Sequence, residues 1–186
     1  MRKPYKLGFV VGRFQTFHNG HADMIGKALG ICEKVAVFIG SSQESGTEKN
    51  PFPYETRANF FKEIYGDAVS VYPLPDLGVG NNPTWGEYVI ENVVERCGEF
   101  PDIMISGKEE RRIGWLAGNT GSKGEKIAEL YVPKTFVVSA TEMRDHLLAG
   151  DYDAWKRNVP RELWDDFPSL REITLAARGN VESSSI

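Results

Sequence analysis

The sequence is poor in cysteine, in long apolar runs and in net charge. Only two of its 186 residues are cysteines, Cys32 and Cys97, and they form no Cys-x-x-Cys pair. Both fall within predicted helices, so we expect free thiols that serve as packing in a reduced, cytoplasmic setting. The apolar run behind the basic N-terminus is too short for a signal peptide, and no stretch approaches a transmembrane span. We therefore expect a cytoplasmic chain without a membrane partner.

Length and charge narrow the class further. The formal net charge is −4, which argues against broad nucleic-acid binding. With 186 residues, no internal repeat and no interdomain linker, the chain is long enough for one domain with a real core. We expect a single domain over residues 1–177, with a core over about 6–150 and a helical region over about 151–177 that packs on it, followed by a polar, frayed tail over 178–186.

Predicted strands and helices alternate along the chain. We expect strands over Leu7–Val11, Lys34–Ile39, Ala68–Tyr72, Ile103–Ser106 and Tyr131–Val138. We expect helices over Gly20–Glu33, Tyr54–Tyr65, Trp85–Cys97, Glu109–Leu116 and Thr141–Ala149. This alternation predicts an α/β fold, a Rossmann-like doubly wound parallel sheet with C-terminal helices. Ligands of such sheets bind beyond the carboxyl ends of the strands, so the loops at those ends should share one edge.

An anion site is predicted where the first strand opens into the first helix. Gly12 lets a backbone approach a ligand closely, and the planar fork of Arg13 suits phosphate oxygens. His18 and His21 are three residues apart, so both rings can lie on the first helical turn, where free N–H groups and the helix dipole favour phosphate. A zinc site is a weaker interpretation, because a catalytic site needs a third ligand and His146 is far away in the sequence. A pair of ordinary structural histidines is the other alternative.

Two further stretches bring polar groups toward the same edge. The hydroxyl-rich loop Gly40–Pro53 follows a strand and, taken alone, is typical of a solvated loop. Ser139 and Glu142 have the spacing of a capping box, so a well-capped helix explains them without any ligand. Arg144, however, falls in the first turn of that helix, where a cation is unfavourable unless an anion offsets it.

The string Gly-Arg-Phe-Gln-x-x-His-x-Gly-His over residues 12–21 resembles the His-x-Gly-His nucleotidyltransferases, and in particular the archaeal-type nicotinamide mononucleotide (NMN) adenylyltransferases. That branch usually has proline at the position of Thr16, a difference that should alter loop stiffness more than chemistry. The resemblance implies the nucleotidyltransferase fold. It also implies that ATP is bound at this segment by Gly12, Arg13, Phe14, His18 and His21.

The resemblance extends to the two other polar stretches. It places Gly40 and Ser41 near the nucleotide, and Lys49 where the family commonly has an arginine facing the triphosphate. Lysine keeps the charge but loses the bidentate fork. It also assigns Ser139, Thr141 and Arg144 to the triphosphate. Arg57 matches a later arginine of the family, or it is structural because it lies one turn into a helix. The implied catalytic set is Arg13, His18, His21, Lys49 and Arg144.

For the acceptor, the resemblance points to Asp76 and to Asn82-Pro-Thr-Trp85. The face of Trp85 can stack on a positively charged pyridinium ring, and Asn82 can both donate to and accept from a carboxamide. A core tryptophan that begins a helix is the alternative for Trp85. Another group stays ambiguous between a nucleotide contact and a solvated basic face: Ser106–Lys108, Arg111 and Arg112.

The implied reaction joins ATP and NMN into NAD and pyrophosphate. The acceptor phosphate is largely dianionic at neutral pH, so no general base is needed, and Mg²⁺ would be carried by the phosphates without protein ligands. A sibling adenylyl- or cytidylyltransferase with another phosphorylated acceptor, such as nicotinate mononucleotide or pantetheine phosphate, is one alternative. A non-catalytic nucleotide sensor and an assembly subunit with a vestigial pocket are the others. Members of the branch tend to form homo-oligomers, but no interface is legible in this sequence.

Overall fold

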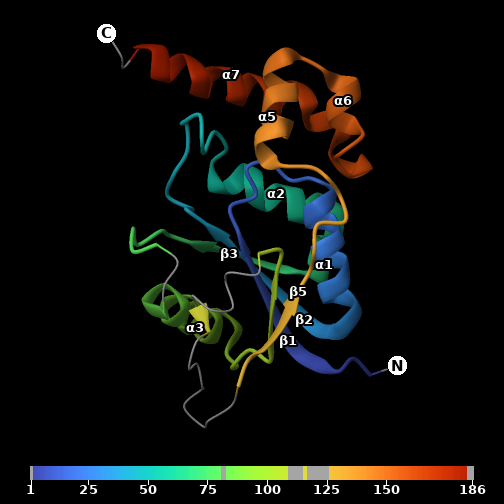
Figure 1. Cartoon of the computed structure of the whole chain (residues 1–186), viewed down its shortest axis with the longest axis vertical. Helices are drawn as coiled ribbons and strands as arrows, with labels where there is room; N and C mark the ends of the chain where they lie inside the picture. The colour runs from blue at the N-terminus through green and yellow to red at the C-terminus, as the bar shows by residue number, and fades with distance from the viewer. Residues whose placement is uncertain (1, 81–82, 109–114, 117–125, 184–186) are drawn as a thin grey trace.

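The computed structural model describes residues 2–80, 83–108, 115–116 and 126–183 (Figure 1). The strands are β1 (Tyr5–Gly12), β2 (Cys32–Gly40), β3 (Ser70–Leu74), β4 (Ile103–Ser106) and β5 (Ala128–Tyr131). The helices are α1 (Asn19–Ile31), α2 (Tyr54–Tyr65), α3 (Pro83–Cys97), α5 (Ala140–Ala149), α6 (Tyr152–Lys156) and α7 (Phe167–Ser183). Short 3₁₀ helices span Gly66–Ala68 and Arg161–Asp166.

The five strands form one parallel sheet with β1 at its centre. Their order is β3-β2-β1-β4-β5, so the chain winds outward from β1 first to one edge and then to the other. In the register Gly12 pairs with Ile39 on one side of β1, and Val10 pairs with Ile105 on the other. This is the predicted doubly wound sheet. Its order reverses between β1 and β4, which is where sheets of this kind open a crevice for ligands.

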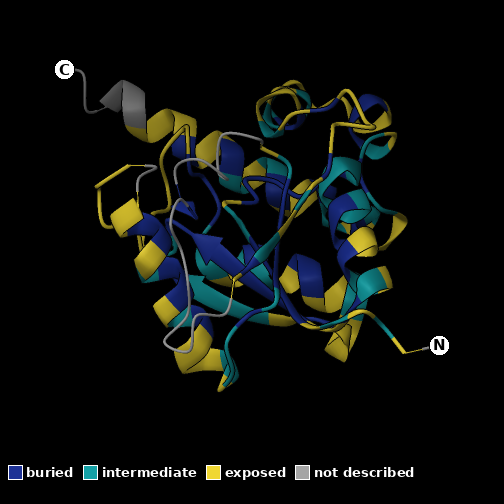
Figure 2. Cartoon of the chain, turned by 60° about the horizontal axis from the view of Figure 1, so that its bottom comes forward, coloured by how far each residue is buried: buried dark blue, intermediate teal, exposed yellow. Residues whose placement is uncertain are grey.

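The side chains of the strands alternate between two cores, one on each face of the sheet. Val10 and Val37 face the core that α1 and α2 cover, whereas Phe9 and Phe38 face the core that α3 covers. Figure 2 shows the strands as mostly buried between exposed helix faces. Helices thus cover both faces, as the alternating pattern predicts.

The C-terminal helices lie together beyond the ends of the strands (Figure 1). Trp155 of α6 is fully buried, and its ring meets that of Phe167 at a centroid distance of 5.2 Å. Both residues belong to the same core as α1 and α2, which joins this region to the sheet. Helix α7 continues to Ser183, so the frayed tail expected from Arg178 onward is helical over most of its length.

Several predicted boundaries agree with the structure, and others are wrong. The predicted bounds of α2 and β4 match the observed ones. Cys32 opens β2 rather than lying in a helix, and Ala68 ends a 3₁₀ turn rather than beginning a strand. The strand expected over Tyr131–Val138 is wrong, because β5 ends where that range begins. The short helix expected over Glu109–Leu116 falls largely outside the described residues.

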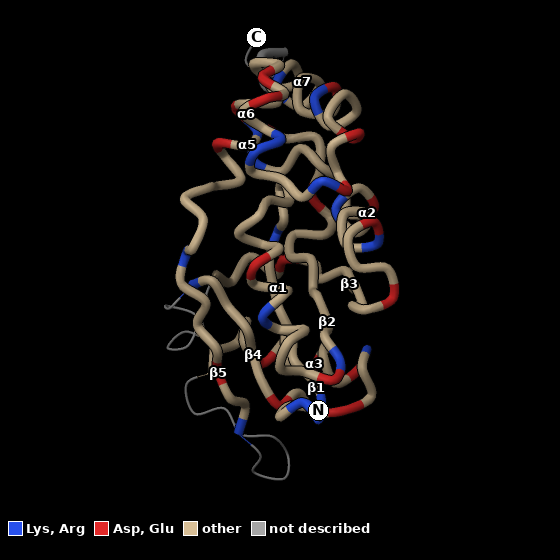
Figure 3. Tube along the Cα trace, turned by 90° about the vertical axis from the view of Figure 1, so that its right-hand side faces the viewer, with Lys and Arg blue, Asp and Glu red and all other residues tan. Residues whose placement is uncertain are grey.

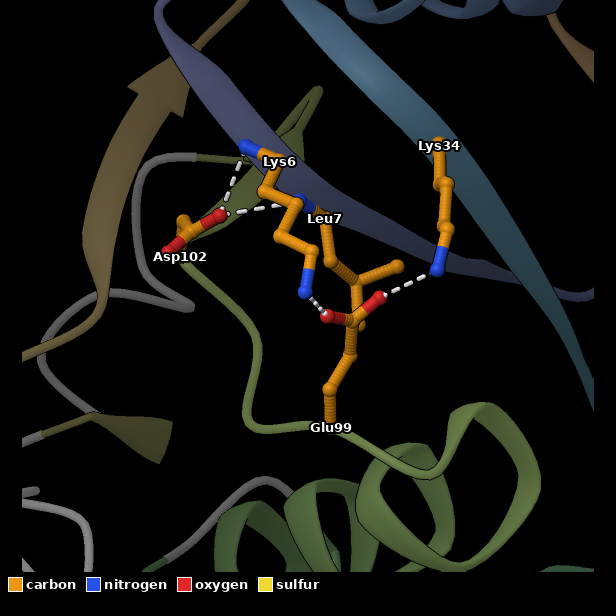
Figure 4. A network of polar contacts seen from close by, with 5 residues as sticks. All are labelled: Lys6, Leu7, Lys34, Glu99 and Asp102. Carbon is orange, nitrogen blue, oxygen red and sulfur yellow. Dashed lines mark hydrogen bonds and ion pairs between the residues drawn. The ribbon is translucent and has the colours of Figure 1, made fainter.

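The amino end of β1 is held by carboxylates from the segment between α3 and β4 (Figure 4). One oxygen of Asp102 accepts the backbone N–H groups of Lys6 at 2.7 Å and Leu7 at 2.8 Å. Glu99 pairs with Lys34 of β2 at 2.7 Å and with Lys6. These contacts hold the amino-terminal end of β1. Ligands of this fold bind at the opposite, carboxyl-terminal ends of the strands.

No helix among the described residues is both long and apolar enough to cross a bilayer.

Acidic and basic residues are interspersed along the chain, and both kinds occur at each end of the molecule (Figure 3).

Candidate active site

Two adjoining cavities lie at the carboxyl ends of the strands. The larger, of about 430 Å³, is bounded by the ends of β1 and β4, the start of α1 and the start of α5. The smaller, of about 270 Å³, lies toward the ends of β2 and β3. Five residues line both: Val11, Gly12, Arg13, Lys49 and Lys108. A shared wall with three cations suits two anionic ligands that meet at that wall.

The two histidines stand side by side at the start of α1 and line the larger cavity. His18 is the N-cap residue, and its carbonyl accepts the N–H of His21 at 2.8 Å and of Ala22 at 3.1 Å. The rings stack with centroids 3.7 Å apart, as their spacing predicts. A Cβ at Gly20 would lie 3.1 Å from the His18 ring. Glycine at this position therefore leaves room for the stacked pair.

Burial keeps both rings neutral. It lowers the pKa of His18 to about 4, and the positive charge of Lys134 adds to the effect. It also lowers the pKa of His21 well below its ordinary value, with a further contribution from His18. The Nδ1 atoms of both rings are buried and have no hydrogen-bond partner in the described part of the chain. The pair thus keeps hydrogen-bonding capacity that the fold itself does not use.

The loop that follows β2 orients the side chain of Arg13. Its Nη1 donates to Oδ1 of Asn50 at 3.3 Å, and Asn50 is itself buried. Asn50 donates its backbone N–H to the hydroxyl of Thr47 at 3.0 Å and its amide to the carboxylate of Glu44. Lys49, on the same loop, is exposed and lines both cavities. The sequence interpretation missed Asn50, whose nearest signal is the Asn-Pro-Phe string.

Gln15 joins three segments that are distant in sequence. Its amide donates to the carbonyl of Phe52 at 3.0 Å and accepts the N–H of Phe52 at 2.9 Å. Its own backbone carbonyl accepts from the guanidinium of Arg144, which also donates to the hydroxyl of Thr141 at 3.3 Å. Gln15 is buried and was not among the expected site residues, although it stands within the matched Gly-Arg-Phe-Gln string.

The start of α5 supplies three more of the predicted ATP residues. Ser139 caps the helix by accepting the N–H of Glu142 at 3.2 Å, which confirms the predicted cap. Ser139, Thr141 and Arg144 all line the larger cavity. Burial lowers the pKa of the Arg144 guanidinium, and the nearby charge of Arg13 lowers it further. A bound anion would relieve that repulsion.

The wall between β5 and α5 adds residues that sequence reasoning missed. Lys134 and Thr135 line the larger cavity, and the hydroxyl of Thr135 donates to the carboxylate of Asp23 on α1 at 3.2 Å. These residues fall in the range that the apolar pattern assigned to a strand, so no signal separated them from ordinary strand positions.

The remaining predicted residues gather at the smaller cavity, which Gly40, Ser41, Asp76 and Trp85 line. Gly40 and Ser41, which were predicted for ATP, thus share this cavity with the expected acceptor residues, and also with Gly12 and Arg13 of the predicted ATP set. Asp76 accepts the N–H of Gly78 at 2.9 Å and lies 3.5 Å from the hydroxyl of Ser41.

Trp85 combines the two interpretations that the sequence left open. It is buried at the start of α3 and packs edge-on against Trp115 at 6.2 Å, yet it also reaches the smaller cavity. Ser106 and Lys108 line the larger cavity, so this part of the ambiguous group lies at the site rather than on a remote face. Asn82, Arg111 and Arg112 lie outside the described residues.

Comparison with known proteins identifies the family. Residues 9–145 match the model of the family described as cytidylyltransferase-like. The chain belongs to the cytidylyltransferase-like family. The matched range begins within β1 and ends within α5, so it includes every cavity-lining residue named above.

Relatives place this cytidylyltransferase-like chain with the archaeal nicotinamide-nucleotide adenylyltransferases. It is 31% identical to the protein of that name from Pyrococcus horikoshii, over 95% of this chain and 91% of the relative. It is 29% identical to the one from Thermococcus kodakarensis, over 96% of this chain and 92% of the relative.

A solved structure supports the fold. A bifunctional NMN adenylyltransferase/ADP ribose pyrophosphatase from Francisella tularensis superposes with a TM-score of 0.73 at 23% identity. The superposition covers 96% of this chain but only 54% of that longer protein.

Proposed function

We propose that this protein transfers the adenylyl group of ATP to NMN, forming NAD and pyrophosphate. The observation that carries the proposal is the shared wall: Arg13 and Lys49 line both cavities at once. A triphosphate in the larger cavity and an acceptor phosphate in the smaller one would meet at this wall. The archaeal relatives named above bear the same activity in their names.

In the reaction, an oxygen of the acceptor's 5′-phosphate forms a bond to the α-phosphorus of ATP. The bond from that phosphorus to the oxygen bridging to the β-phosphate breaks, and pyrophosphate leaves with its electron pair. A phosphate monoester has a second pKa near 6, so the acceptor is mostly a dianion at neutral pH and needs no general base. Catalysis then consists of positioning and of charge stabilisation.

The histidines act as neutral donors in this scheme. Because burial lowers the pKa of both rings, each offers one N–H to phosphate oxygens at neutral pH. Arg13, Lys49 and Arg144 supply the positive charge that stabilises the developing pyrophosphate. Removing one donor of this kind typically costs 10²–10³ in rate.

Magnesium enters as part of the substrate, Mg-ATP. The described residues contain no group of three or more His, Cys, Asp or Glu side chains placed to hold a metal ion. Mg²⁺ commonly keeps its waters and binds through substrate phosphates, and we propose that it does so here.

Nicotinamide is the preferred acceptor base, in our proposal, because Asp76 faces the smaller cavity. A carboxylate there repels the carboxylate of nicotinate but accepts a hydrogen bond from an amide. The faces of Trp85 and of a pyridinium ring attract each other in either case. Replacing Asp76 with Asn should therefore raise the relative rate with nicotinate mononucleotide.

The test is pyrophosphate release from Mg-ATP with NMN and with nicotinate mononucleotide in parallel, with CTP in place of ATP as a third arm. Release with ATP and NMN, together with the appearance of NAD, is the expected result. Faster release with CTP or with nicotinate mononucleotide would move the chain to a sibling activity. ATP binding without release in any arm would instead favour a nucleotide sensor.

A further inference from the structure

Arg57 is a fully buried arginine whose guanidinium, among the described residues, bonds to backbone carbonyls alone. It lies in the first turn of α2 and is 0% exposed. Its Nη1 donates to the carbonyls of Arg13 at 3.0 Å and Gly40 at 2.9 Å, and its Nη2 donates to that of Ser41 at 3.1 Å. Its Nε donates to the carbonyl of Pro53 at 3.4 Å. Arg57 forms no ion pair with a carboxylate in the described part of the chain.

Those carbonyls belong to the two loops that carry the site. Arg13 follows β1, whereas Gly40 ends β2 and Ser41 follows it, so one planar fork ties together the carboxyl ends of two neighbouring strands. Two non-glycine residues beside these bonds have left-handed backbones: Phe14 with φ 53° and Ser41 with φ 47°. Such conformations persist only where surrounding contacts enforce them.

The charge of Arg57 is costly where it lies. Burial lowers its pKa to about 10, and the neighbouring charge of Arg13 lowers it further against the opposing effect of Glu55. A buried cation without an ion-pair partner stabilises a fold less than a well-packed apolar side chain of similar size. Stability alone therefore accounts poorly for an arginine here, whereas a need to hold several carbonyls in one plane accounts for it well.

We propose that Arg57 is a positioning residue for nucleotidyl transfer, whose fork fixes the wall shared by the two substrate cavities. The inference rests on the proposed function. Arg57 lines neither cavity, so it acts through Arg13 and Ser41 rather than on the substrates. Lysine cannot replace it, because a single ammonium cannot hold carbonyls of both strands in the plane that a guanidinium fork sets.

The test compares Arg57→Lys with Phe60→Leu, a change to a buried residue on the same helix whose side chain has no hydrogen-bond donor for these carbonyls. Both variants should lose thermal stability. The activities are compared at a temperature where circular dichroism shows that both variants are folded. Arg57→Lys should lose about 10²-fold in kcat, which is the scale expected for a small misplacement of reacting groups. Phe60→Leu should keep the wild-type kcat. Equal kcat in wild type and folded Arg57→Lys would overturn the proposal.

A second measurement uses the wild-type protein and so does not depend on the folding of a variant. A guanidinium held at both Nη atoms should give separate, slowly exchanging Nη proton signals by NMR, with and without Mg-ATP. Averaged signals in the nucleotide-free protein would mean that the fork is free to rotate, which contradicts the proposal. If wild type binds ATP but makes no NAD, the proposed function fails. The ratio of ATP affinities between wild type and Arg57→Lys then still tests the positioning role, and equal affinities would overturn it.

Discussion

The rings of His18 and His21 lie nearly parallel, with 17° between their planes and 3.7 Å between their centroids. Two imidazolium ions at this separation would repel each other strongly, so the arrangement requires that at least one ring be neutral. Burial meets that requirement for both. The first two predictions concern this pair.

Stability should depend on pH through His18. Its pKa is about 4 in the folded protein against 6.5 ordinarily, so between these values the unfolded chain binds the extra proton. The difference contributes roughly 3 kcal/mol to the free energy of unfolding. This contribution is fully present above about pH 6.5 and is lost as the pH falls toward 4. Urea unfolding at pH 7.5 and 5 should show a smaller pH effect in His18→Gln than in wild type. His146→Gln is the matched control, and identical pH dependence in wild type and His18→Gln would contradict the shift.

His21→Ala should remove activity with little effect on folding. The ring has no hydrogen-bond partner at Nδ1 among the described residues, so its loss costs the fold mainly ring packing. We expect kcat to fall by about 10²–10³ while circular dichroism is unchanged. His146→Ala serves as the control. A His21→Ala protein with near-wild-type kcat would remove this ring from the mechanism.

Arg144→Lys should impair ATP use although the charge is kept. The guanidinium of Arg144 reaches both the Gln15 carbonyl and the Thr141 hydroxyl, a pair of contacts that suits a fork better than a single ammonium. We expect kcat/KM for ATP to fall on the order of 10²-fold, measured by pyrophosphate release. The exposed Arg161→Lys change should have no effect. Similar values for both variants would show that charge alone suffices at position 144.

If Mg²⁺ enters with the nucleotide, as we propose, chelation should stop the reaction. Adding EDTA should abolish pyrophosphate release, and excess Mg²⁺ should restore it fully. Calorimetry of Mg²⁺ with the nucleotide-free protein should give no saturable binding. A saturable site in the absence of nucleotide would mean that the protein itself supplies ligands.

Asp102→Ala should weaken the fold and spare catalysis. The change leaves the N–H groups of Lys6 and Leu7 without their carboxylate acceptor, at a cost of about 1–3 kcal/mol. Because these contacts lie at the amino end of β1, kcat at 25 °C should match wild type. Urea unfolding and the pyrophosphate assay test the two halves, and Glu99→Ala should show a smaller loss of stability because its ion pairs are more exposed.

Local sequence patterns predicted the elements whose boundaries are marked by neighbouring residues such as proline and glycine. Helix α2 has Pro53 before it and Gly66 after it, and its predicted bounds are the observed ones. The range Tyr131–Val138 was mistaken for a strand because it is apolar, yet Val137 is 96% exposed while Val138 is buried. Apolar composition without regular alternation does not separate a strand from a loop that lines a cavity.

The site divides in the same way. The Ser139 cap and the placing of both histidines at the first turn of α1 depend on residues three apart, so spacing alone predicted them. Gln15 was missed because its partner Phe52 is 37 residues away, and only the folded sheet brings the two together. The grouping of Gly40 and Ser41 with Asp76 and Trp85 at one cavity was likewise out of reach, because it depends on which cavity each strand end faces.

The bond from Arg144 to the carbonyl of Gln15 spans 129 residues of sequence. During synthesis, β1 and the start of α1 leave the ribosome long before α5 does. The larger cavity therefore lacks one wall until α5 has emerged. Contacts of such long range form late because their loop closure costs the most entropy. A nascent chain of this protein therefore lacks the complete larger cavity. If ATP binds there, as we propose, binding reinforces the completion of folding by mass action.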